Sequence, residues 1–122
     1  MNEISSPTRK FLKEINAGIT SLVLLCVVNR SDEPMYGYQI AKQIDFGSEH
    51  GLSMKQSGLY PVLRSLEKNE LLESRVEPSV SGPPRRYYQI TDDGIETLEE
   101  WKDIWHHVKE NVDAILEGGN ND

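Results

Sequence analysis

Five polar side chains in the middle of the chain have the types and spacing of a helix that reads DNA. They are Lys55, Gln56, Ser57, Tyr60 and Arg64. The first three stand at the expected N-terminus of this helix, where side chains enter a major groove and backbone N–H groups face a phosphate. Gln56 is the best candidate for reading a base, because its amide can pair bidentately with adenine. We expect Arg64 to meet a phosphate rather than pair with its helix neighbours, and Tyr60 either contacts DNA or packs its ring on the preceding helix.

Two further cations, Arg85 and Arg86, follow a turn built from Gly82, Pro83 and Pro84. A turn of this composition is rigid, so we expect it to form a hairpin tip that projects both guanidinium groups outward. There they can contact phosphates or enter a minor groove. The alternative is an ordinary pair of solvated surface charges.

The distribution of charge favours DNA binding, although the net charge of the whole chain is −7. Residues 1–52 carry five basic and six acidic side chains, residues 53–90 carry six and four, and residues 91–122 carry two and ten. Charges more than about 8–10 Å apart are largely screened. The region expected to meet DNA is therefore locally positive, and we expect binding that depends strongly on salt.

Hydrophobic spacing predicts three helices that position these side chains. Apolar residues recur every three or four positions from Thr8 to Asn29, and the spacing resumes in residues 36–44 after a polar loop. The third helix has two possible N-caps, Ser53 and Ser57, and the first of these has the spacing of a capping box. It is expected to end near Asn69, which tolerates the left-handed conformation that terminates helices.

The C-terminal side of these helices predicts a hairpin and one more helix. Residues 71–76 and 87–90 are candidate strands, with residues 78–86 at the tip between them. The fold class is therefore mainly α with a small β-hairpin, which is a winged helix-turn-helix plus a C-terminal dimerisation helix. We expect the winged helix-turn-helix domain to span residues 8–91 and the dimerisation helix to span residues 92–117.

An apolar stripe on this last helix predicts a dimer. The expected interface residues follow an alternating spacing of three and four: Leu98, Trp101, Trp105, Val108, Val112 and Ile115. A single terminal helix cannot hide such a stripe, and a small domain has limited core to cover it. A second copy of the chain is the simplest partner.

Other features exclude several classes of function. The single cysteine, Cys26, allows neither an intrachain disulfide nor a cysteine-based metal site. The adjacent histidines His106 and His107 point to different sides of a helix, so we expect no metal site and no cofactor. No nucleophile, acid and base are spaced for catalysis, so we do not expect an enzyme. The apolar run 19–28 is shorter than the roughly 20 residues that span a bilayer, which favours a cytoplasmic protein without a membrane segment.

Three motifs in order resemble the PadR-type transcriptional regulators. They are Tyr-Gly-Tyr-Gln-Ile at residues 36–40, Gly-Leu-Tyr-Pro-Val-Leu-Arg-Ser-Leu-Glu at 58–67, and Arg-Arg-Tyr-Tyr-Gln-Ile-Thr-Asp-Asp-Gly at 85–94. The resemblance covers residues 17–94 and implies a winged helix-turn-helix repressor that dimerises through its C-terminal helix. The chain departs from the family by having Asn69 where a glycine usually follows the third helix, and its C-terminal part is short, as in the smaller members.

These observations predict a homodimeric repressor that binds a palindromic operator in double-stranded DNA. A winged-helix module that binds another protein and not DNA is the alternative, and the two arginines after the turn favour DNA. A third expectation is compatible with the first. Trp101 and Trp105 could also form a pocket for a small aromatic or cationic effector by stacking and cation–π attraction, although bulky interface packing is the simpler role.

Overall fold

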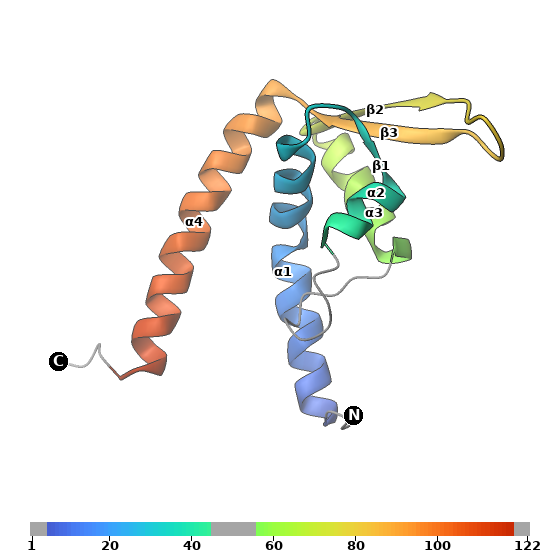
Figure 1. The fold of residues 1–122 in the computed structure, drawn as a ribbon. Coiled ribbons are helices and arrows are strands. Elements are labelled where there is room, and N and C mark those ends of the chain that lie inside the picture. Colours follow the sequence, from blue (N-terminus) through green and yellow to red (C-terminus); the bar gives the residue numbers. More distant parts are fainter. Residues whose placement is uncertain (1–4, 45–55, 119–122) are drawn as a thin grey trace.

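The computed structural model describes residues 5–44 and 56–118, with the side chains of residues 56 and 57 left out. Seven elements follow one another along this part of the chain. They are α1 (Ser6–Arg30), β1 (Met35–Tyr36), α2 (Gly37–Ile44), α3 (Gln56–Lys68), β2 (Leu72–Glu77), β3 (Arg85–Ile90) and α4 (Asp92–Leu116). Figure 1 shows α1, α2 and α3 packed below a small sheet, from which α4 descends beside α1. The predicted fold class is confirmed.

The core lies where α1, α2, α3 and the sheet meet. Its fully buried side chains come mainly from the apolar spacing that predicted the helices: Leu24, Leu25, Ile40, Ile44, Leu59, Leu63, Leu72 and Leu98. Only the C-terminal half of α1 contributes to this core, because its N-terminal half extends beyond the domain (Figure 1). α1 is long and apolar enough to cross a membrane, but a core helix passes the same test. The buried residues of α1 all lie within the apolar run 19–28.

The sheet has three antiparallel strands in the order β1, β3, β2. The hairpin of β2 and β3 was predicted, whereas the two-residue β1 was not. β1 pairs with β3 through Met35 opposite Tyr88 and Tyr36 opposite Tyr87. Since successive residues of a strand point to opposite faces, Met35 and Tyr88 face the core and Tyr36 and Tyr87 face away from it. The hairpin, here called the wing, extends beyond the helices (Figure 1).

Both ends of α3 differ in detail from the prediction. α3 begins at Gln56, so Ser57 is a helical residue and not its N-cap, while Ser53 lies outside the described residues. At the other end, the residue with positive φ is Glu70, at 65°, and not Asn69. The N–H of Glu70 donates to the carbonyl of Glu67 at 2.9 Å, and the next N–H donates to the carbonyl of Leu66 at 2.9 Å. These paired bonds form a Schellman motif, in which the residue with left-handed backbone is Glu70. The prediction had placed that residue one position earlier, at Asn69.

Replacing Glu70 by glycine is expected to stabilise the fold by about 1 kcal/mol. A non-glycine residue in the left-handed region is strained by contact between its Cβ and the backbone, and glycine removes this contact. Thermal unfolding of Glu70→Gly and Glu70→Ala would separate the causes, since alanine removes the carboxylate but keeps the strain. Equal stabilisation by both substitutions would show that charge, and not backbone strain, is responsible.

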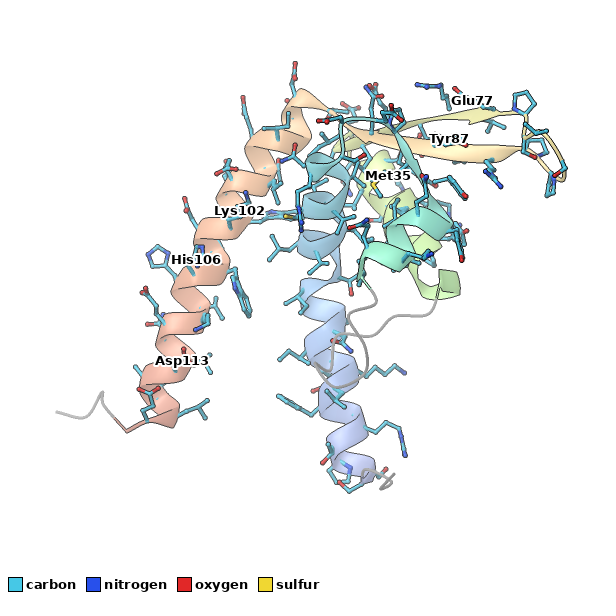
Figure 2. The ribbon with its side chains drawn as sticks, viewed as in Figure 1. Met35, Glu77, Tyr87, Lys102, His106 and Asp113 are labelled. Carbon is cyan, nitrogen blue, oxygen red and sulfur yellow. The ribbon has the colours of Figure 1, made fainter. Side chains whose placement is uncertain are left out.

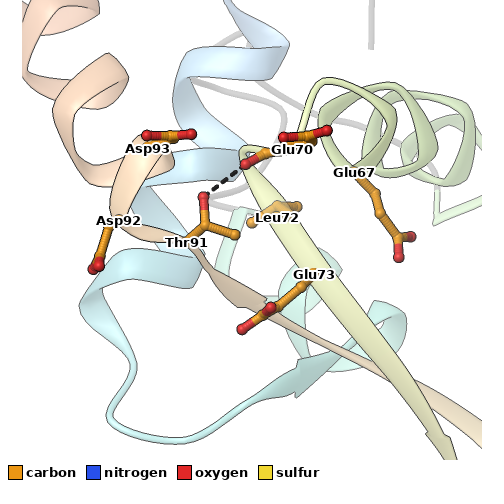
Figure 3. Close-up of a pocket in the computed structure, with 7 residues that line it drawn as sticks. All are labelled: Glu67, Glu70, Leu72, Glu73, Thr91, Asp92 and Asp93. Carbon is orange, nitrogen blue, oxygen red and sulfur yellow. Dashed lines mark hydrogen bonds between the residues drawn. The ribbon is translucent and has the colours of Figure 1, made fainter.

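A hydrogen-bonded junction fixes the start of α4 against the end of α3. The hydroxyl of Thr91 donates to the carbonyl of Glu70 at 2.7 Å (Figure 3). The same hydroxyl accepts the N–H of Gly94 at 2.9 Å, which makes Thr91 the N-cap of α4. The backbone N–H of Thr91 also donates to the carbonyl of Leu71 at 3.1 Å. This junction sets the direction in which α4 leaves the sheet.

Candidate nucleic-acid interface

Four of the five residues predicted to read DNA belong to α3, and the fifth, Lys55, lies outside the described residues. Gln56 and Ser57 lie in the first turn of α3, as expected for residues at a helix N-terminus. The ring of Tyr60 packs directly on α2: a Cβ added to Gly37 would lie 2.6 Å from its hydroxyl oxygen. The packing role weighed for Tyr60 is therefore present, and the tyrosine is half-buried with part of its surface exposed.

Arg64 of α3 and Arg86 of β3 both lie within electrostatic reach of the phenol of Tyr88. Burial raises the pKa of the Tyr88 phenol, the carboxylate of Glu67 acts in the same direction, and the guanidinium groups of Arg86 and Arg64 oppose both. Tyr60 is also within electrostatic reach of this phenol. Two predicted cations that lie 22 positions apart in the sequence thus share one neighbourhood between helix and wing.

A chain of hydrogen bonds joins the wing to α3 at this place. Nη1 of Arg86 donates to the hydroxyl of Ser74 at 3.0 Å, and this hydroxyl donates to the carboxylate of Glu67 at 2.7 Å. Ser74 and Glu67 were not singled out in the sequence, because nothing local indicates that a strand serine meets the last turn of a helix. These hydrogen bonds fix Arg86 of the wing relative to α3.

The two arginines of the wing are not at its tip, contrary to the prediction. Both belong to β3, where Arg85 lies opposite Glu77 and Arg86 opposite Val76. The tip closes within residues 78–84, where the hydroxyl of Ser79 lies within 3.0 Å of three tip carbonyls. As neighbours in a strand, the arginines point to opposite faces of the sheet. Arg86 faces α3, and the guanidinium of Arg85 lies over the ring of Tyr36, 4.3 Å from its centre.

Acidic side chains gather at the opposite end of the sheet from the wing tip. Five carboxylates line a shallow pocket of about 510 Å³ there: Glu67, Glu70, Glu73, Asp92 and Asp93 (Figure 3). Asp92 and Asp93 lie in the first turn of α4, where the helix dipole favours negative charge. Glu67, Glu70 and Glu73 belong to residues 53–90, so the acidic side chains of this pocket come from the locally positive segment as well as from the C-terminal helix.

An apolar groove lies between residues 15–22 of α1 and residues 101–113 of α4. It has a volume of about 840 Å³ and is lined by Ile15, Gly18, Ile19, Ser21, Leu22, Trp101, Ile104, Trp105, Val108, Lys109, Val112 and Asp113. Most of the predicted interface residues line it or lie beside it. Leu98 is the exception, since it is 0% exposed and belongs to the chain's own core. Of the predicted interface residues, those left for a partner therefore begin at Trp101.

Three helices, a three-stranded sheet with an extended hairpin and a fourth long helix define a winged-helix protein. The family model of PadR-like transcriptional regulators matches residues 24–100. The chain belongs to this family.

Individual relatives agree with this assignment. Uncharacterized protein X from Lysinibacillus sphaericus is 32% identical over 104 residues, which are 85% of this chain and 93% of that protein. A PadR family transcriptional regulator from Eggerthella lenta is 32% identical and has a TM-score of 0.76, over 93% of this chain and 94% of that one. Bacillus subtilis PadR in complex with operator DNA is 22% identical, with a TM-score of 0.60 over 68% of this chain and 46% of that one, and shares the fold.

Proposed function

We propose that this transcriptional regulator is a homodimeric repressor that binds a specific palindromic operator. The observation that carries the proposal is the Arg86–Ser74–Glu67 chain of hydrogen bonds, which ties the wing to α3. A helix for the major groove and a fixed hairpin beside it are the two parts with which winged helices grip a duplex. The related fold of Bacillus subtilis PadR, solved in complex with operator DNA, supports the same use of these elements.

The dimer part of the proposal rests on the exposed apolar side of α4. Trp105 is 37% exposed and Val108 47% exposed, and both line the groove against α1. Large apolar side chains that stay accessible along four turns of a helix favour burial by a partner. A second copy fits best, because a two-fold axis would place two α3 helices on one side of the assembly.

Footprinting on the promoter of this protein's own gene is expected to show a palindromic site. Two α3 helices in successive major grooves place the half-site centres about 34–36 Å apart, which is one turn of DNA. Gln56→Ala should reduce the preference for this site over random DNA, because it removes the candidate base contact. Lys13→Ala, an exposed change on the far part of α1, is the matched control.

The same experiment distinguishes the protein-interaction alternative. A module that binds only a protein would protect no promoter fragment and would not shift random duplex at low salt. An asymmetric protected site would contradict the symmetric dimer while leaving DNA binding intact. Such a regulator acts where the chromosome lies, so we place it in the cytoplasm.

We further propose that the groove admits a flat aromatic or cationic effector. Trp101 and Trp105 both line it, one turn of α4 apart, and indole faces bind such compounds by stacking and cation–π attraction. Planar aromatic cations are expected to quench tryptophan fluorescence saturably in the parent protein, and quenching should be largely lost in Trp105→Ala while the dimer survives. Absence of quenching by every such compound would leave the tryptophans with a purely structural role.

A further inference from the structure

A second surface of partly exposed rings and exposed cations lies on the side of the sheet that points away from the core. We call it the aromatic–cation patch, and it consists of Tyr36, Tyr38, Lys42, Arg85 and Tyr87. These residues come from β1, α2 and β3, so distant parts of the sequence build one continuous surface. Tyr87 lies on the wing in Figure 2. None of the tyrosines was predicted to have a binding role, although Tyr38 and Lys42 have the i, i+4 spacing of neighbours on a helix.

The rings and cations of the patch hold one another in place. Nζ of Lys42 lies 5.6 Å from the centre of the Tyr38 ring, and the guanidinium of Arg85 lies 4.3 Å from that of Tyr36. The Tyr36 ring stacks on Tyr38 with 6.5 Å between centres and meets Tyr87 edge-on at 5.4 Å. Cations over ring faces lose little mobility on binding because their positions are already restricted.

The patch is locally positive although the chain is acidic. Residues 35–44 and 85–90 contain Lys42, Arg85 and Arg86 and no acidic side chain. Glu77, which lies opposite Arg85 in the sheet, pairs with Arg75 on its own strand. Tyr38 is 50% exposed, so its hydroxyl donor lies beside Lys42 at the surface. Tyrosine hydroxyls, lysine and arginine are among the side chains that contact DNA phosphates.

The patch also adjoins the part of α3 that is expected to enter the major groove. Tyr36 and Tyr38 flank Gly37, on which the ring of Tyr60 of α3 packs. The backbone N–H of Tyr36 donates to Oε1 of Gln39 at 3.1 Å, which holds the N-terminal turn of α2 against the end of β1. A duplex seated on α3 therefore brings a sugar–phosphate strand close to this turn.

Building on the DNA-binding function proposed above, we propose that the aromatic–cation patch binds the phosphodiester backbone. Tyr38 and Lys42 are its distinctive contacts: the ammonium group meets a phosphate and the tyrosine hydroxyl donates to the same strand. The contact is independent of base sequence. It clamps the strand that flanks the groove read by α3, and Arg85 extends it onto the wing.

The test measures binding of the full chain to its own promoter fragment and to a random-sequence duplex, across a series of salt concentrations. Lys42→Ala is expected to weaken binding to both duplexes by the same factor, about threefold to tenfold, and to reduce the slope of log affinity against log salt by about one unit. Tyr38→Phe should weaken both by a smaller common factor without changing the slope, because no charge is lost. Lys13→Ala is again the control, and circular dichroism checks the fold of each variant.

The outcomes separate this inference from the proposed function. If the parent binds neither duplex, both proposals are wrong. If the parent binds and Gln56→Ala reduces sequence preference, but Lys42→Ala and Tyr38→Phe leave affinity and salt slope unchanged, only the backbone contact is overturned. A loss in Lys42→Ala confined to the promoter fragment would also overturn it, because a backbone contact must weaken all sequences alike.

Discussion

Replacing Gly94 by alanine is expected to destabilise the fold by about 3 kcal/mol or more. A Cβ at this position would lie 2.2 Å from the carbonyl oxygen of Leu71 and 2.6 Å from Cγ1 of Ile90. Because the nearer atom belongs to the backbone, no side-chain rotation can relieve the contact. The first turn of α4 would have to move away from the end of α3, and the hydrogen bonds through Thr91 would lengthen with it.

Thermal unfolding measures this effect, with a fall of roughly 10 °C or more expected for a chain of this size. Gly58→Ala is the matched control, because Gly58 is also helical but a Cβ there meets nothing within 4 Å. That variant should be slightly more stable than the parent, since alanine favours a helix over glycine by up to about 1 kcal/mol. Equal stability of the two variants would show that α4 can shift freely against Leu71.

The helices could be predicted from the sequence because their signals are local. α1 and α2 each have apolar residues at three-four spacing, and their observed bounds lie within two residues of the predicted ones. β1 has no such signal. It contains two residues, and only their pairing with Tyr87 and Tyr88, some fifty positions later, makes them a strand. Pairing of this kind depends on the fold as a whole.

Position relative to the core was harder to predict than element type. The spacing on α4 placed Leu98 in the same stripe as Trp105, but α4 leaves the core partway along its length. Leu98 is consequently internal, whereas Trp105 faces the groove. Helical periodicity identifies a shared face and carries no information on where that face stops being covered.

The wing illustrates the same limit for strands. Composition predicted a turn at residues 78–86, but the turn occupies residues 78–84, so β3 includes both arginines. Strand alternation then separates their side chains. Arg86 bonds to the network that reaches α3, whereas Arg85 belongs to the aromatic–cation patch. Two identical neighbouring residues give no sign in the sequence that their surroundings differ in this way.

Val112→Asp is expected to dissociate the proposed dimer into folded monomers. Val112 is 46% exposed and lines the groove between α1 and α4, so a partner packed along this side of α4 would bury it. A carboxylate placed there would be desolvated in an apolar interface, and the nearby Lys109 already pairs with Asp113, so the cost is several kcal/mol. The fold of each chain should survive, because the side chain is not part of the chain's own core.

Analytical ultracentrifugation at micromolar concentration measures this dissociation, with circular dichroism to check that α4 stays helical. Asn111→Asp is the matched control: it adds the same charge at the preceding, exposed position, away from the apolar stripe. Val112→Lys should dissociate the dimer too, which excludes simple repulsion from the acidic helix as the cause. Because a monomer offers one α3 to one half-site, the Val112 variants should also lose protection of the palindrome. A Val112→Asp protein that is still dimeric would mean that the stripe packs within one chain, with α4 folded onto α1.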